Sequence, residues 1–459
     1  MHSAIRKLSL AAALGAPIFA QQSNPGAVTI EQAVSQAGQF PSITAAEEQV
    51  NAAAAGIRLA RTNYLPSLNA IGQVNRATRN NVFGLLLPQA IIPSMSGPVL
   101  GTDNGTTVWG SAAGVLVSWE PFDFGRRHAL VRSAEAVQER VQASAERTRF
   151  ETQTSAAAAF LTVLASEQTV RVAQASVERA RILVRSVKAL ADAKIRPGAD
   201  LSRADTELDA AETQLMQAQQ SRDVARTSVA ELTGTDLARL LLAPGPFLER
   251  TPQTALTAAD LSKNPLAKEQ AAAVAESQSK IAVLARSYRP TFEVQGAAYG
   301  RGSGALADGH TLGGAGGLAP NYVNFGAGFT VNFPIFSLPS IRAQEAQAAA
   351  LERSAAATYK QVLADLQAQS GAAQATLEQA RRIASETPKE VQDARTGLAQ
   401  ADAQYRAGLA TIVAVAEAQR LLAQAEIDDS LAKLAVWRAW LQIQIAQGDI
   451  SAFLQEASR

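Results

Sequence analysis

Two long stretches of the chain place apolar or small residues at alternating spacings of three and four. One runs from about 126 to 195 and the other from about 340 to 405. This spacing is typical of helices that pack as coiled coils, and about 70 helical residues measure on the order of 100 Å. The repeating positions are Val170, Ala173, Val177, Ala180, Val184 and Val187 in the first stretch, and Leu351, Ala355, Tyr359, Val362, Leu366, Ser370, Ala373, Leu377 and Ala380 in the second.

Four shorter stretches alternate side chains with period two, which is typical of β-strands. They lie at about 67–79, 108–119, 291–301 and 322–333. In the last stretch Val323, Phe325 and Phe329 share an apolar face, and polar residues fill the other. Trp109 and Trp119 stand near both ends of the second, as interfacial aromatics do in membrane strands. The pattern favours a barrel wall between lipid and water, although the edge strand of a soluble sheet would also fit.

Four shorter helices are predicted at 28–63, 200–235, 257–287 and 409–447. Thr29 and Gln32 have the spacing of a capping box at the start of the first. Placed end to end, two of these helices match the length of one long helix. Each half of the chain therefore predicts one continuous rod beside one rod made of two pieces.

The elements occur twice in the same order, at an offset near 210 residues, with Gly198 matching Gly408 and Glu207 matching Glu417. A repeat of this size describes the whole architecture. We expect a first repeat over 21–235 with a strand pair at about 67–119. A linker over 236–256 then leads to a second repeat over 257–450, with a strand pair at about 291–333 and a C-terminal tail over 451–459. Residues 1–20 have the basic start and apolar run of a signal peptide cleaved after Ala20.

Composition excludes several classes of function. The chain has no Cys, three scattered His and a net charge of +1, so it predicts no metal site, no Cys nucleophile and no nucleic-acid partner. The glycine-rich stretch at 313–317 lacks the Lys and Ser or Thr of a phosphate-binding loop. No cofactor site and no catalytic constellation can be drawn, and the chain is not expected to be an enzyme. It also lacks an apolar run of about 18 residues, so a membrane role requires strands.

Four strands are too few to close a barrel in one chain, and an open sheet edge in lipid leaves backbone groups without partners. Oligomerisation is the physical solution. The order of the predicted helices and strands resembles that of the TolC family of outer-membrane efflux proteins, the outer membrane factors. The most specific segment is Tyr405-Arg-Ala-Gly408-Leu-Ala-Thr-Ile-Val413-Ala-Val-Ala-Glu417-Ala-Gln-Arg-Leu-Leu422.

The resemblance implies an α+β membrane protein that is a homotrimer. Each chain would give four strands to a 12-stranded transmembrane β-barrel, continuous with a long α-helical coiled-coil barrel. The trimer would sit in the outer membrane of a Gram-negative bacterium, in contact with its lipid, and extend into the periplasm.

The implied function is the exit duct of a tripartite efflux pump or a type I secretion system. Such a duct passively conducts small molecules or proteins from the periplasm to the exterior. Its implied partners are a periplasmic adaptor (membrane fusion protein) and an inner-membrane pump of the RND, ABC or MFS type, engaged directly or through the adaptor. The alternative is a periplasmic coiled-coil adaptor or scaffold protein. Two strand pairs argue against it, since an adaptor would have one helical hairpin between unlike β domains.

The resemblance also implies which residues form the functional sites. The pore gate would use Tyr405, Glu417, Glu207 and Asp205. The adaptor would dock on the helix tips, at Arg196, Gly198 and Asp200 in the first repeat and at Gly408, Leu409 and Thr411 in the second. Glu207 and Glu417 both follow their turn glycine by nine residues and would form one ring of up to six carboxylates. The alternative is that both are merely solvated.

Two departures from the family pattern concern the gate. Ala410 and Ala414 stand where the family has a gate Arg and a gate Asp, so Asp200, Arg203 and Asp205 would have to supply the ion pairs. Arg126 and Arg127 follow a strand directly. They would either meet lipid head groups or be exposed at a helix start. Trp437 and Trp440 are expected to be packing residues.

Overall fold

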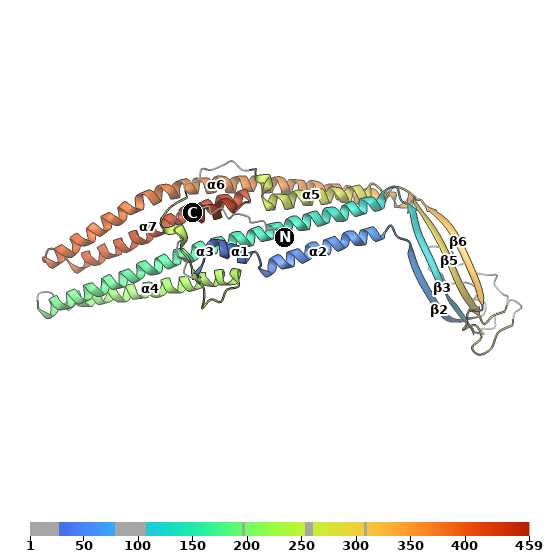
Figure 1. Ribbon diagram of the computed structural model, residues 1–459, viewed down its shortest axis with the longest axis horizontal. Helices are drawn as coiled ribbons and strands as arrows, with labels where there is room; N and C mark the ends of the chain where they lie inside the picture. The colour runs from blue at the N-terminus through green and yellow to red at the C-terminus, as the bar shows by residue number, and fades with distance from the viewer. Residues whose placement is uncertain (1–26, 79–106, 195–197, 253–259, 307–309, 459) are drawn as a thin grey trace, which may run out of the picture.

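The computed structural model describes residues 27–78, 107–194, 198–252, 260–306 and 310–458 (Figure 1). The molecule is long and narrow, with helices along most of its length and one β-sheet at one end. The proposed signal peptide, most of the loop between the first two strands, and Arg196 lie outside the described residues. No helix in the described ranges combines the length and the apolar character that crossing a membrane requires.

Two long helices extend along most of the helical part of the molecule. Helix α3 (Arg126–Asp192) has 67 residues and α6 (Leu338–Arg406) has 69, which confirms the prediction from the seam. Of the α6 seam, Leu366, Ser370 and the three positions after it are buried, whereas Leu351 is exposed. The seam near the sheet is therefore open in a single chain.

Four shorter helices lie beside the long ones. Helices α2 (Pro41–Thr62) and α4 (Gly198–Thr233) both pack on α3, while α5 (Pro265–Leu284) and α7 (Ile412–Gln447) pack between α3 and α6 (Figure 1). These helices form one layer, called the wall below. Across the wall the order is α2 and α4, then α3, then α5 and α7, then α6. This is the predicted arrangement of one continuous rod beside one rod made of two pieces.

The helix predicted over 28–63 is broken. A short strand, β1 (Ala27–Val28), precedes α1 (Ile30–Ala37), and α2 starts only at Pro41. The capping box of Thr29 and Gln32 is confirmed, because each side chain bonds the other's backbone N–H. Pro41 has no N–H to continue a helix and instead occupies a first-turn position. The predicted start of the third short helix, at 257, is also wrong: a 3₁₀ turn, η3 (Leu261–Lys263), precedes α5.

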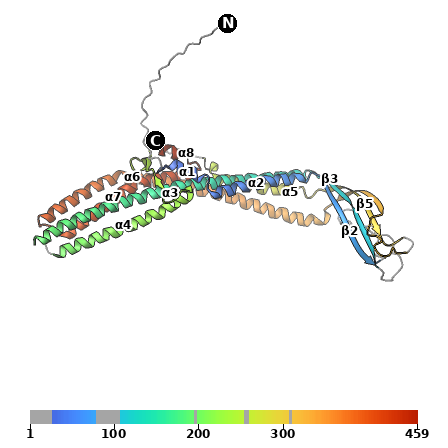
Figure 2. The ribbon, with the colours of Figure 1, turned by 60° about the horizontal axis from the view of Figure 1, so that its bottom comes forward.

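The linker and the C-terminal tail are ordered. In the linker, β4 (Leu241–Leu242) pairs in parallel with β1, and a 3₁₀ turn, η2 (Gly245–Leu248), follows. The tail forms α8 (Ser451–Ala457). Together with α1 these segments lie on one side of the long helices (Figure 2). The middle of the rod therefore has a second layer on that side only.

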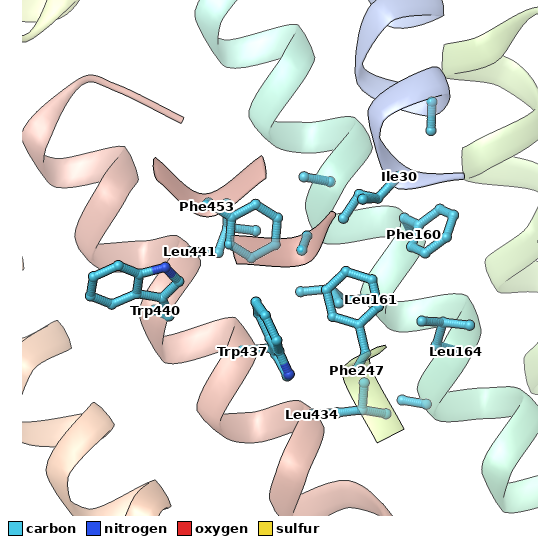
Figure 3. Close-up of a cluster of buried hydrophobic side chains, with 14 of the residues drawn as sticks. Ile30, Phe160, Leu161, Leu164, Phe247, Leu434, Trp437, Trp440, Leu441 and Phe453 are labelled. Atoms are coloured by element: carbon cyan, nitrogen blue, oxygen red, sulfur yellow. The ribbon is translucent and has the colours of Figure 1, made fainter. Parts of the chain in front are cut away.

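The main hydrophobic core lies beneath this layer. Phe247 from η2 and Phe453 from α8 meet Trp437 of α7 and Phe160 of α3, all nearly inaccessible to solvent (Figure 3). The Phe247 and Trp437 ring centroids are 4.8 Å apart. The Trp437 Nε1–H donates to the Arg250 carbonyl at 2.9 Å. Trp440 is buried as well, so both tryptophans are packing residues, as predicted.

The sheet consists of β2 (Ser67–Thr78), β3 (Thr107–Phe122), β5 (Thr291–Ser303) and β6 (Tyr322–Asn332). The strand order is β2-β3-β5-β6 and all neighbours are antiparallel. After β6 a 3₁₀ turn, η4 (Ile335–Ser337), leads into α6. Among these four strands, β2 and β6 each have one edge without a partner.

The two faces of the sheet differ in chemistry. Val115, Ala298 and Phe325 lie in one row across three strands, and this face is apolar and exposed, with Phe325 at 90% and Val323 at 89%. The opposite face carries polar residues: Asn69, Gln73, Asn75, Ser118, Glu293, Gln295, Asn324 and Thr330. Such a contrast fits a wall with lipid on one side and water on the other.

The junction of β3 and α3 corrects the prediction for Arg127. Its side chain is buried, where its Nε donates to Asp123 Oδ2 at 2.9 Å and its guanidinium lies over the Tyr64 ring at 4.9 Å. Arg126 forms an ion pair with Glu120 at 3.1 Å. Arg127 is therefore neither a lipid ligand nor exposed at the helix start. It forms a buried ion pair with Asp123, three residues before the predicted helix.

Candidate functional site

The two helical turns lie at the same end of the molecule, opposite the sheet (Figure 1). The turn after α6 reverses through Gly408, whose φ of +82° lies in the left-handed region that glycine adopts without strain. Among the described residues that follow α3, Lys194 has a positive φ, at +58°. Gly198 instead opens α4. Residues 195–197, between Lys194 and Gly198, lie outside the described residues.

This changes the internal alignment of the two tips. Helices α4 and α7 both have 36 residues and begin 214 positions apart, as do the reversal residues Lys194 and Gly408. The offset of 210 is therefore about one helical turn too short at this end. By the corrected offset Glu417 corresponds to Arg203, and Glu207 corresponds to Leu421. By this offset the two glutamates do not occupy equivalent positions of the two repeats.

Tyr405 joins the two helical hairpins at the tip. It is 1% exposed, and its hydroxyl donates to Asp200 Oδ2 in the first turn of α4 at 3.3 Å. Its ring belongs to a small apolar cluster drawn from all four helices at this end: Leu183, Val187, Ala204, Ile412 and Val415. By the corrected offset Ala191 stands at the corresponding position of the first repeat. Only the second repeat therefore supplies this link.

Most of the other described tip residues are open to solvent. Leu409 is 82% exposed directly after Gly408, and Thr411 is exposed at the N-cap of α7. Gly198 is exposed at the start of α4, and Asp200 is half-buried. An exposed leucine at a tight turn offers a small apolar contact to another helical tip.

The predicted gate carboxylates lie apart. Glu207 is half-buried between α4 and α7, where Arg420 lines the same cavity. Glu417 is exposed and forms an ion pair with Arg420 at 2.5 Å. Asp205 precedes Glu207 by two residues, which places it on the other side of α4, and it does not line this cavity. The structure therefore brings Glu207 and Arg420 together but not Asp205.

A continuous groove extends from this cavity along α3. Helices α4 and α7 both pack on α3 but barely meet each other, which leaves adjoining hollows of about 260 and 730 Å³. Ser176, Gln214, Arg420 and Ala423 line both. The larger hollow reaches Arg438, and its α3 floor consists, apart from Val172, of small and hydroxyl residues: Thr162, Ala165, Ser166, Thr169, Ala173 and Ser176. Sequence reasoning missed Arg420 and Arg438, although their separation of 18 positions, about five helical turns, already places them on one face of α7.

The described residues contain no group of three or more His, Cys, Asp or Glu side chains arranged to hold a metal ion. The tip and the groove instead offer hydrogen bonds, a link between the two hairpins and charged side chains. Their chemistry suits contact and conduction.

Comparison with known families decides the identity. The family model for outer membrane efflux proteins matches residues 33–235 and 258–449. The chain belongs to the outer membrane efflux protein family. As a member it is a channel of the Gram-negative outer membrane that extends into the periplasm, and it is not an enzyme. The family works with a periplasmic adaptor and an inner-membrane pump.

Solved structures of the same fold support this assignment. The Campylobacter jejuni CmeC outer membrane channel has a TM-score of 0.74 at 14% identity, over 99% of this chain and 98% of CmeC. The outer-membrane channel OprN has a TM-score of 0.73 at 19% identity, over 91% of this chain and 89% of OprN. The open state of the Neisseria gonorrhoeae MtrE channel has a TM-score of 0.72 at 17% identity, over 92% of this chain and 89% of MtrE. Comparison with curated proteins yields no match.

Family membership gives the two sheet faces their meaning. Three copies of the four-stranded sheet close a 12-stranded barrel, so the free edges of β2 and β6 find partners in neighbouring chains. The apolar face with Val115 and Phe325 is the lipid face, and the polar face with Asn69 and Gln295 lines the lumen. The alternative of a periplasmic adaptor is not supported.

Proposed function

We propose that this outer membrane efflux channel is the exit duct of a tripartite efflux pump or a type I secretion system. In this role it passively conducts small molecules or proteins from the periplasm to the exterior. The observation that carries the proposal is the arrangement of the two tips. Both hairpins end together, far from the sheet, and Tyr405 ties them to each other (Figure 1).

In this proposal the link between Tyr405 and Asp200 is the gate. Ala410 and Ala414 cannot form ion pairs, so the hydrogen bond and the apolar cluster around Tyr405 hold the hairpins together. Opening the duct requires the α6–α7 hairpin to separate from the α3–α4 hairpin at this point. A link of this size stabilises a state by a few kcal/mol at most, which suits a gate that a partner must open.

Glu207 and Glu417 then act as lumen carboxylates at two heights. Glu207 is the tenth residue of α4 and Glu417 the sixth of α7, so the two lie about 6 Å apart along the axis. Arg420 forms an ion pair with Glu417 and lines the same cavity as Glu207. A trimer would hold two rings of three carboxylates, which favour cations only weakly.

The exposed tips are the proposed docking surface for the adaptor. Because the chain has no Cys, a single cysteine at Leu409 or Ala199 provides a unique attachment point for a photo-crosslinker. In cells, Leu409→Cys should capture a periplasmic adaptor, with the crosslinked peptide at the tip of the adaptor's own helical hairpin. Leu312→Cys is the matched control, because Leu312 is also exposed but follows β5 at the opposite end of the molecule. Equal capture at both positions, or none at the tips, would refute docking at the tips.

A further inference from the structure

Arg438 is a cation in the groove without a matching anion. It is exposed, and its Nη2 donates a long hydrogen bond to Thr162 Oγ1 at 3.4 Å. No carboxylate of the described residues forms an ion pair with it. Arg420 on the same face of α7 is paired with Glu417. A guanidinium stays charged at every physiological pH, so Arg438 leaves one positive charge in the groove uncompensated.

The groove opens toward the lumen. Thr162, Ser166 and Thr169 form its floor on α3, whereas Phe160 and Leu164 on the other side of α3 pack beneath the layer of α1, α8 and the linker (Figure 3). That layer lies on one side of the wall only (Figure 2). Helices α4 and α7 flank the groove on the side of the wall without the added layer, so this side can face inward when the wall closes into a tube, whereas the added layer would fill the lumen.

The walls of the groove combine polar and apolar chemistry. Gln217, Gln424 and Ser221 offer hydrogen-bond donors, and Ile427 and Leu431 add apolar surface on the same side of α7 as Arg438. The hollow of about 730 Å³ is large enough for a drug-sized molecule. An acidic group would meet Arg438 while an apolar body lay on Ile427 and Leu431.

We infer that this groove is a transit site for amphipathic organic anions, with Arg438 as the residue that binds their sulfonate or carboxylate group. By threefold symmetry the duct would carry three such sites in one ring. The ring lies about 27 Å beyond Arg420 along α7, well above the tip. The inference rests on the exit duct proposed above, and it adds a preference among the molecules that pass.

The test uses the full-length trimer and naphthalene-1-sulfonate as the probe, with 1-naphthylmethylammonium as its charge-reversed counterpart. In planar bilayers the sulfonate, added from the tip side, should block current. Arg438→Gln should raise the half-blocking concentration about tenfold, the loss expected for one charge-assisted hydrogen bond. Arg438→Lys should retain part of the effect, because a point charge replaces the planar fork. Block by the ammonium probe should not weaken in Arg438→Gln.

Arg171→Gln is the matched control. Arg171 is exposed, lies on α3 nine positions from Thr162, and therefore faces away from the groove. It should leave the sulfonate block unchanged, and equal block in both glutamine variants would overturn the inference. Calorimetric titration of trimers in lipid nanodiscs measures the same affinity difference without an open gate. If no variant conducts, the duct proposal fails while this titration still decides whether Arg438 binds the anion.

Discussion

The hydroxyl of Tyr405 donates to a carboxylate oxygen of Asp200 across 3.3 Å, and this contact connects the end of α6 to the start of α4. The distance is long for a hydrogen bond between oxygens, so its contribution should be at the low end of the usual range. The buried ring contributes more, because it packs among apolar residues of both hairpins.

Removal of the hydroxyl alone should loosen the gate. Tyr405→Phe keeps the ring in place and removes about 0.5 kcal/mol from the closed state for each link, so the ratio of open to closed channels should rise about twofold per link lost. Single-channel recording measures that ratio. Tyr359→Phe, at a half-buried position of α6 far from the tip, is the control and should behave like the wild type. An unchanged open fraction in Tyr405→Phe would remove this hydrogen bond from the gate.

The ion pairs of Glu276 predict a pH dependence of stability. Burial by itself raises the pKa of the Glu276 carboxyl, but hydrogen bonds from Lys280 and Arg140 outweigh this effect and hold the pKa below its ordinary value of 4.5. A lowered folded-state pKa means that the pairs stabilise the protein above pH 4.5 and lose this effect as the pH falls through the folded value.

The variant Glu276→Gln should therefore lower the unfolding free energy by about 1–3 kcal/mol at neutral pH, and the difference from wild type should shrink below about pH 4.5. Thermal unfolding at a series of pH values measures this. Glu378→Gln is the control, since the pair of Glu378 with Arg382 is about two-thirds exposed and should contribute little at any pH. A constant difference across the pH range would show that Glu276 acts through packing alone.

A single glycine controls the contact between the end of α7 and the start of α5. Gly448 has a φ of +80°, and a Cβ there would lie 2.6 Å from Asn264 Cα. Asn264 itself caps α5 and donates to the carbonyls of Ile445 and Ala446, both at 3.0 Å. Gly448→Ala should cost about 1–2 kcal/mol from backbone strain, before the clash is counted.

The paired variant Gly371→Ala should have the opposite sign. Gly371 lies inside α6, and a methyl group added to it would have no neighbouring atom within 4 Å. Alanine should therefore stabilise the helix by about 0.5–1 kcal/mol. Melting temperatures of the two trimers should move in opposite directions. A gain of stability in Gly448→Ala would show that the junction of α5 and α7 tolerates rearrangement.

The two buried tryptophans predict unequal effects of the same substitution. Trp437 Nε1 donates to the Arg250 carbonyl, whereas Trp440 Nε1 is buried and has no acceptor among the described residues. Both changes to Phe remove similar volume, but Trp437→Phe also leaves the part-buried Arg250 carbonyl without this partner. It should cost about 1–2 kcal/mol more than Trp440→Phe in chemical denaturation. Equal costs would mean that packing alone sets the value of both residues.

Much of the wall could be predicted from local patterns. The seam from Leu351 to Ala380 determines a long helix because its period recurs many times, and a wrong choice at one position changes little. The strands followed from alternation in the same way. Gly408 was placed correctly because a tight reversal after a helix favours glycine.

The sequence-based predictions differ from the structure where tertiary contacts determine the local conformation. Lys194 adopts a left-handed conformation, as Gly408 does, so these two residues align the tips about one helical turn away from the alignment by glycines. Arg127 is buried because Asp123 and Tyr64 come together around it, and only the folded junction brings them together. The break before Pro41 carried a local signal, but the uninterrupted alanine-rich run that follows concealed it.

The parallel pairing of β1 with β4 has a consequence for the order in which the chain acquires its structure. Ala27 pairs with Leu241, so the first described residues find their partners only after more than 200 others have been made. Contacts so distant in sequence form slowly, because the intervening chain must first be closed into a loop. Although β1 precedes the other described elements in the chain, it should therefore be among the last of them to pair.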